Sequence, residues 1–196
     1  MKAITELLPI FEQRLSQYFP EALSRLNAGL SKEQIDDTIS SYELDFTDDV
    51  YSYFEWKNGI SHENIKSTDQ LLLFPNGIPF TLAEAVHDYE ELAIKKSVFE
   101  SNYFPLFNDG NESFLLINLD PDAPDYNMIS LCSPKLYGDA QPITIYDSFA
   151  SMLETAITAF DQKAVWISDG SLESDSDSYY QVASEINPNS DYWQYD

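Results

Sequence analysis

Apolar residues at helical spacing predict helices through the first part of the chain. The first predicted helix carries its apolar residues on one face: Ile4, Leu7, Leu8, Phe11, Leu15 and Tyr18. Pro20 interrupts this helix, and a further helical turn is expected over 22–26. Ser31 and Gln34 have the spacing of a capping box, so a second helix is expected from there through Ile39.

Two further helices begin at recognisable N-caps. Thr47, followed by two aspartates, is expected to open a helix with Val50 and Phe54 inward, closed by Gly59 in the left-handed conformation. A turn is expected around Asn76. A second capping box, TLAE at 81–84, precedes a helix with one apolar face: Leu82, Ala85, Val86, Tyr89, Leu92 and Ala93.

The stretch FPLFNDGNESFLLINLD, residues 104–120, consists of two apolar runs joined by an Asp-Gly turn. Asp-Gly between apolar runs is the strongest short-range hairpin signal, because glycine tolerates the positive φ of a tight connection. Short polar connections favour antiparallel pairing. Strands are expected in these places: 104–107, 112–119, 127–132 and, more weakly after Pro142, 143–146.

The pattern as a whole predicts an α+β fold with a mostly antiparallel sheet of about four to six strands packed by helices. The last predicted helix is capped by Asp147 and has a wide apolar stripe: Phe149, Met152, Leu153, Ala156, Ile157 and Phe160. It is expected to cover the sheet. Residues 1–166 are interpreted as one domain and 167–196 as a C-terminal extension.

The extension is acidic and aromatic. The stretch SDGSLESDSDS by itself is typical of a disordered segment. This stretch is followed by large aromatic residues, which are uncommon in a disordered tail because they favour burial: Tyr179, Tyr180, Tyr192, Trp193 and Tyr195. We therefore expect the extension to dock on the domain.

Charge narrows the classes of partner. Ten basic residues stand against 34 acidic ones, a formal net charge of −24, which repels nucleic acid and anionic membranes and attracts cationic partners. The alternative interpretation is the hydrated coat of a halophilic or very soluble protein. Cys132 is alone, the apolar residues near the start are interrupted by charges, and no uncharged run reaches the roughly 18 residues of a membrane span, so a cytoplasmic location is expected.

No recognisable catalytic constellation is present in the sequence. His62 and His87 lack a neighbouring nucleophile motif and are expected at the surface, and no phosphate-binding loop occurs. Asp120, Asp122 and Asp125 invite a calcium interpretation, but the glycine and distal glutamate of an EF-hand are missing and a solvated turn is favoured. We expect no catalytic residue, cofactor or metal. An acidic hydrolase, which requires two carboxylates in a cleft, stays an alternative.

Over 31–166 the order of these motifs resembles the SUKH superfamily of Smi/Knr-like cell-wall assembly regulators and bacterial immunity proteins. The resemblance rests on Asn58-Gly59 after an aromatic helix, the TLAEAVHDYEEL helix, the FPLFNDGNESFLLINLD stretch, and Ser148-Phe149 opening the last helix. The chain departs from the family pattern at Asp45-Phe46-Thr47 and at Ile60. The resemblance implies an α+β binding protein without catalytic residues.

Charge and resemblance together give the leading hypothesis. They predict an immunity protein whose acidic surface neutralises a basic, possibly nuclease, toxin domain. The alternative is a protein-binding regulator or scaffold of the same family with no toxin partner. Candidate partner-binding residues are acids and aromatics in three places: Glu55, Trp56, Asp109, Glu112, Asp120, Asp122, Asp125 and Tyr126. For Trp56, packing against the core is the favoured interpretation.

Overall fold

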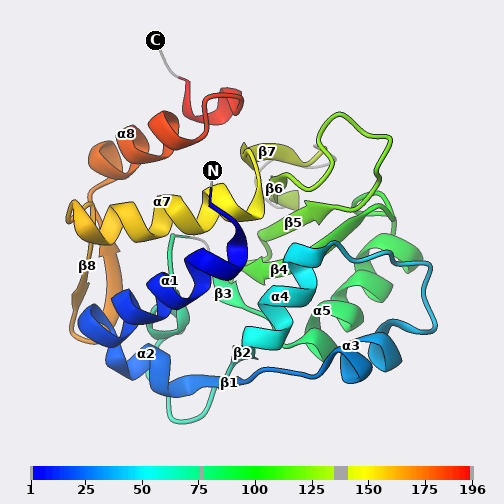
Figure 1. Cartoon of the computed structure of the whole chain (residues 1–196), viewed down its shortest axis with the longest axis horizontal. Helices are drawn as coiled ribbons and strands as arrows, with labels where there is room; N and C mark the ends of the chain where they lie inside the picture. Colours follow the sequence, from blue (N-terminus) through cyan, green and yellow to red (C-terminus); the bar gives the residue numbers. More distant parts are fainter. Residues whose placement is uncertain (1, 76, 135–140, 195–196) are drawn as a thin grey trace.

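The central layer of the molecule is an antiparallel sheet with the strand order β3–β4–β5–β6–β7 (Figure 1). The computed structural model describes residues 2–75, 77–134 and 141–194. The five strands of this sheet are β3 (Ile78–Pro79), β4 (Tyr103–Asn108), β5 (Phe114–Asn118), β6 (Ile129–Cys132) and β7 (Ile143–Tyr146). Helices pack around the sheet, so the predicted α+β class with an antiparallel sheet is confirmed.

The predicted Asp-Gly hairpin joins β4 and β5. Asn108 pairs with Phe114 and Phe107 with Leu115. Gly110 has φ 77° and Glu112 has φ 72°, so β5 begins two residues later than predicted. The Asp109 carboxylate holds this loop, because it accepts bonds from the backbone N–H groups of Asn111 and Ser113 at 2.7 and 3.0 Å.

Helices cover the sheet and pack on one another (Figure 1). The aromatic core centres on Phe107, whose ring centroid lies 5.4 Å from that of Tyr53, 5.0 Å from Phe74 and 6.1 Å from Phe149. The α-helices are α1 (Ile4–Tyr18), α2 (Pro20–Arg25), α3 (Lys32–Ile39), α4 (Asp48–Trp56), α5 (Leu82–Asp88), α7 (Phe149–Asp161) and α8 (Ser176–Ile186). The other helical segments described are the 3₁₀-helices η1 (Thr68–Leu71) and η3 (Asp191–Trp193) and the π-helix η2 (Tyr89–Lys95).

Local capping signals were good guides to helix starts. Both predicted capping boxes, Ser31 with Gln34 and Thr81 with Glu84, form reciprocally. Thr47 caps α4 through a bond from the Val50 N–H. The predicted N-cap of α7 was wrong by one residue. Ser148, not Asp147, caps this helix by accepting a bond from the Ser151 N–H at 3.0 Å. The Asp147 carboxylate instead accepts from the Asn189 side chain at 2.8 Å.

Asn58-Gly59 is not a helix cap, so that prediction was also wrong. Helix α4 ends at Trp56, and β2 (Lys57–Ile60) pairs with β1 (Leu26–Ala28) in a small antiparallel sheet. Gly59 does have positive φ, at 71°. Its Cα faces the start of α5, where an added Cβ would lie 2.3 Å from the Thr81 nitrogen, so close packing between segments requires glycine here.

The helix predicted from Thr81 changes its hydrogen-bond pattern midway. Helix α5 runs to Asp88 and the π-helix η2 continues to Lys95. The predicted apolar face is buried at Leu82, Ala85 and Tyr89. Single-turn π segments often occur at functional sites, but apolar spacing does not distinguish them from an α-helix.

The C-terminal residues form structure that the sequence pattern did not predict. β8 (Val165–Ser168) and β9 (Ser171–Ser174) make a hairpin, so residue 166 lies within a strand. Helix α8 packs beside α7 (Figure 1), where the Asn187 side chain donates to Thr155 Oγ1 at 3.0 Å. The Trp193 indole donates to the carbonyl of Ile145 on the edge strand β7. Tyr195 and the predicted turn residue Asn76 lie outside the described residues.

Candidate protein-binding surface

The connection between β5 and β6, residues 119–128, is an acidic loop held by hydrogen bonds to neighbouring strands and to helix α4. Asp125 accepts two bonds, from the Tyr103 hydroxyl and from the Asn118 side-chain amide, both at 2.7 Å. Asn118 is 1% exposed, and its own side-chain oxygen accepts from Asn102 and from the Asp120 N–H, both at 2.9 Å. Burial first, and the bond to Asp125 second, raise the pKa of the Tyr103 hydroxyl.

A second set of bonds ties this loop to helix α4. The Asn127 side chain donates to Asp49 at 3.2 Å, and its oxygen accepts from the Thr47 hydroxyl at 3.2 Å. Thr47 is also the N-cap of α4, where the helix dipole favours the carboxylates of Asp48 and Asp49. The loop and the helix start are therefore held as one polar unit.

Beside this loop lies an acidic groove of about 300 Å³. Three carboxylates and no lysine or arginine line it, and none of the three is in an ion pair within the described residues. The lining residues come from the approach to α4, from the turn before β4 and from the loop: Glu43, Leu44, Asp45, Ser101, Asn102, Leu119, Asp120 and Pro121. We call the four carboxylates Glu43, Asp45, Asp120 and Asp122 the acidic face; three of them are exposed and Asp120 is partly buried.

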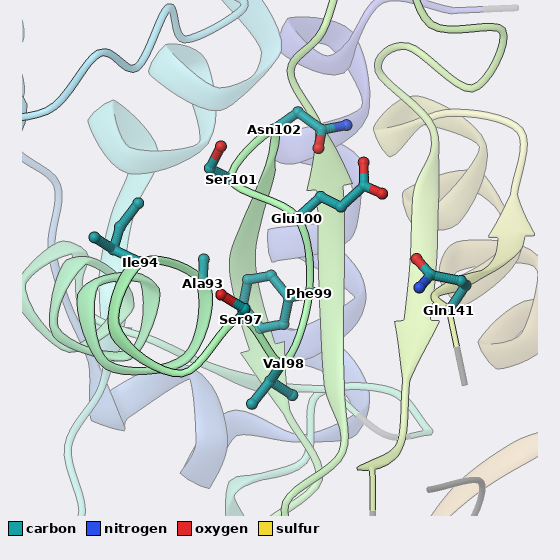
Figure 2. Close-up of a pocket in the computed structure, with 9 residues that line it drawn as sticks. All are labelled: Ala93, Ile94, Ser97, Val98, Phe99, Glu100, Ser101, Asn102 and Gln141. Atoms are coloured by element: carbon teal, nitrogen blue, oxygen red, sulfur yellow. The ribbon is translucent and has the colours of Figure 1, made fainter. Parts of the chain in front are cut away.

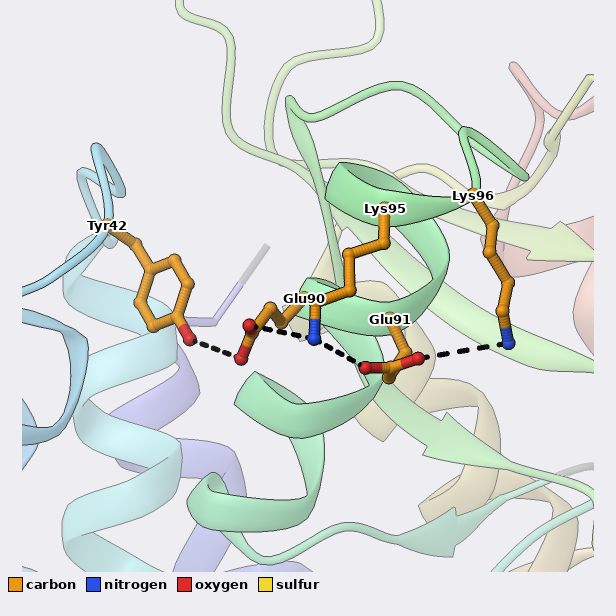
Figure 3. A network of polar contacts seen from close by, with 5 residues as sticks. All are labelled: Tyr42, Glu90, Glu91, Lys95 and Lys96. Atoms are coloured by element: carbon orange, nitrogen blue, oxygen red, sulfur yellow. Dashed lines mark hydrogen bonds and ion pairs between the residues drawn. The ribbon is translucent and has the colours of Figure 1, made fainter.

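Lys95 and Lys96, which are neighbours in sequence at the end of the π-helix η2, form ion pairs with two glutamates of that helix (Figure 3). Lys95 Nζ lies 2.7 Å from Glu91 and 3.0 Å from Glu90, and Lys96 lies 3.9 Å from Glu91. Tyr42 donates a further bond to Glu90 at 3.0 Å. The hydrogen bonds to Lys95 lower the pKa of both glutamates, so the carboxylates stay charged at neutral pH. This Lys95-Lys96 pair therefore supplies no net positive patch for a polyanion.

Ser101 and Asn102, which line the acidic groove, also line a larger cavity of about 550 Å³. Figure 2 shows the residues that line this larger cavity. Apolar residues from the end of the π-helix form one side, with Ile94 51% exposed. Glu100 is its single carboxylate among the described residues, and no histidine or cysteine lines it. The described lining offers no nucleophile paired with a base.

The eight sequence-predicted residues do not form one surface. Asp120, Asp122, Asp125 and Tyr126 share the loop after β5, whereas Asp109 and Glu112 lie at the other end of that strand, about 17 Å away at roughly 3.3 Å per residue. Glu55 lies at the end of α4 opposite to the residues that hold Asn127. These positions separate the candidates into distinct regions.

Several of the predicted residues have internal partners. Trp56 donates to Glu12 at 2.6 Å and packs on Phe11 with ring centroids 6.2 Å apart, as the packing interpretation predicted. Asp125 uses both carboxylate oxygens within the loop. Asp122 and Tyr126 remain exposed, Tyr126 by 42%.

Sequence reasoning missed Glu43 and Asp45. They are about 75 residues from Asp120 along the chain, and only the packing of the segment before α4 against the β5–β6 loop brings them together. Local patterning carries no signal for such a contact. Within residues 2–75, 77–134 and 141–194, no three His, Cys, Asp or Glu side chains are arranged to hold a metal ion.

No protein-family model matches this chain, and no curated protein matches it significantly. The resemblance to the SUKH superfamily therefore stays a prediction. Among the described residues, no helix has both the length and the apolar character needed to cross a bilayer.

Proposed function

We propose that this chain is a non-catalytic immunity protein whose acidic face binds a basic bacterial toxin domain. The observation that supports this proposal is the acidic loop itself, which is hydrogen-bonded to the buried Asn118 side chain while carboxylates on its outer side lack cationic partners among the described residues. A pre-formed surface binds without the entropy cost of ordering a loop.

Electrostatics gives the expected mode of association. Unpaired carboxylates on a chain with a net charge of −24 attract a cationic domain over about a Debye length, roughly 8 Å at physiological salt. A nuclease toxin must carry positive charge to hold phosphates, so the acidic face can occupy the surface that such a toxin uses for its substrate. Association is expected to be fast and to weaken as salt rises.

The test uses the protein encoded by the reading frame immediately upstream. Its binding to the full chain is measured by surface plasmon resonance at low and physiological salt. In one variant the acidic face is neutralised by Glu43→Gln, Asp45→Asn, Asp120→Asn and Asp122→Asn. A matched control removes as many exposed charges elsewhere, by Glu63→Gln, Asp169→Asn, Glu173→Gln and Glu185→Gln.

We expect the acidic-face variant to bind about 10- to 100-fold more weakly, mainly through a slower association rate, and the control to stay within about threefold. Protection of cells that express the toxin should fall in parallel. Equal weakening in both variants would mean that net charge alone matters. If the protein encoded by the upstream reading frame does not bind the chain, the proposal of a toxin partner is contradicted, and a regulator that binds another protein is favoured.

A further inference from the structure

Both histidines of the chain line one cavity on a different part of the surface from the acidic face. His62 follows β2, His87 lies in the last turn of α5, and both side chains are exposed. The cavity has a volume of about 310 Å³. Its lining residues come from three separate segments: His62, Phe80, Ala83, Glu84, His87, Asp88 and Asn108.

The base of this cavity is aromatic. Phe80 is 8% exposed and its ring is nearly parallel to that of Phe114, with centroids 6.4 Å apart and an interplanar angle of 21°. Phe80 and the two histidines bring three π-systems to the lining of the cavity. The faces of aromatic rings attract cations, and planar cations such as guanidinium can also stack on them.

The walls carry negative charge at fixed positions. Glu84 and Asp88 are one helical turn apart on α5, and the described lining of the cavity contains no lysine or arginine. Glu84 is held in place by the capping box, in which its Oε2 accepts from the Thr81 N–H at 2.8 Å. Asp88 is half-buried, which raises the pKa of its carboxyl, and neither acid is in an ion pair within the described residues.

Other ligand classes fit less well. The described side chains do not form a metal site, and an anion would meet two carboxylates. A wholly apolar ligand would remove water from both carboxylates without replacing their hydrogen bonds. The volume, near the lower end of the roughly 300–1,000 Å³ of ligand pockets, suits one small group.

We propose that this cavity is a binding site for an organic cation, with a guanidinium group seated between the Phe80 ring and the carboxylates of Glu84 and Asp88. The aromatic base supplies a cation–π contact and the carboxylates supply charge-assisted hydrogen bonds. The proposal does not depend on a toxin partner, because it concerns residues outside the acidic face.

The two imidazoles make the site directly observable, since no other histidine contributes signals. The full chain is titrated with arginine amide at pH 8 while the imidazole proton signals of His62 and His87 are followed by NMR. Citrulline amide, which has the same shape but no charge on its terminal group, is the control ligand. Spermidine tests whether an ammonium can replace the guanidinium.

We expect both imidazole signals to shift and saturate with arginine amide and to move little with citrulline amide. Glu84→Gln keeps the capping box, because glutamine serves at that position, and Asp88→Asn changes only the charge. Each substitution is expected to weaken the binding of arginine amide at least about tenfold, whereas Glu43→Gln in the acidic face is expected to change this affinity by no more than about twofold. Circular dichroism and the urea midpoint check that the variants fold.

Three outcomes would overturn the proposal. They are shifts that never saturate with arginine amide, equal shifts with citrulline amide, and folded Glu84→Gln and Asp88→Asn variants that bind arginine amide as the natural chain does. Saturation by spermidine with the same dependence on Glu84 and Asp88 would support the site and assign it to organic cations in general. Failure of the cation-site proposal does not affect the proposal for the acidic face, because the two experiments use substitutions of different residues.

Discussion

The two ends of strand β5 carry acidic loops of different construction. At the hairpin end, Asp109 holds the loop by accepting bonds from backbone groups no more than four residues away. At the other end, Asp125 and Asn127 are held by residues on β4 and at the start of α4, up to 80 residues away. The hairpin loop is therefore a local structure, whereas the 119–128 loop depends on the assembled fold.

This difference separates structural acids from acids that can bind a partner. In the 119–128 loop Asp125 accepts bonds from the buried Asn118 amide and from the Tyr103 hydroxyl, whereas the Asp122 side chain is exposed to solvent. Acidic composition alone does not reveal this division. The comparison predicts that substitutions at the two ends differ in their cost to stability.

The largest effect is expected for Asn118→Leu. The substitution removes bonds to Asp125, Asn102 and the Asp120 N–H and leaves these groups without their buried partner. We expect the free energy of unfolding to fall by about 3 kcal/mol, measured by urea denaturation. Asn111→Ala in the exposed hairpin loop is the matched control, with a change within about 0.5 kcal/mol. Equal losses would refute the difference between the loops.

A smaller loss is expected for Asp109→Ala. The hairpin loop loses the acceptor of two backbone N–H groups, as in the loss of a helix cap, and we expect about 1.5 kcal/mol of destabilisation by urea denaturation. Asp109→Asn keeps a side-chain oxygen and should recover most of this stability. No recovery with asparagine would indicate that charge, not the local bond, holds the loop.

Tyr103→Phe is expected to cost about 1 kcal/mol at pH 7, through the lost bond to Asp125. Its cost should shrink at alkaline pH. The folded protein raises the pKa of this hydroxyl above its ordinary value of 10.0, so above that pH the unfolded tyrosine loses its proton while the folded one keeps it. The free energy of unfolding of the natural chain therefore falls as the pH rises above this value. The Tyr103→Phe variant lacks the titrating hydroxyl, so this loss does not occur in it. Urea midpoints of both proteins at pH 7 and above pH 10 measure the difference, and a constant gap would contradict it.

The smallest effect on stability is expected for Asp122→Asn. This side chain is exposed and accepts no bond from the buried network, so the free energy of unfolding should change by less than about 0.5 kcal/mol. The same substitution should slow association with the proposed cationic partner, measured by surface plasmon resonance. A clear loss of stability would place Asp122 among the structural acids instead.

The sequence located the regular elements better than it located the candidate site. Capping boxes at Ser31 and Thr81 and the Asp-Gly hairpin were predictable, because their bonds join residues a few positions apart. The placement of Gly59 was not, because its close contact with Thr81 belongs to tertiary packing. For the site, sequence indicated Asp120 and Asp122 but not Glu43 and Asp45.

The sequence by itself determined the α+β class and the central hairpin, which depend on the spacing of residues along the chain. It also determined the acidic character of the protein, which depends on composition alone. Only the tertiary structure decided which acids are occupied by internal bonds, which carboxylates meet in a groove, and that His62 and His87 share one cavity. These outcomes depend on contacts between distant segments, whose register is fixed when the whole core packs.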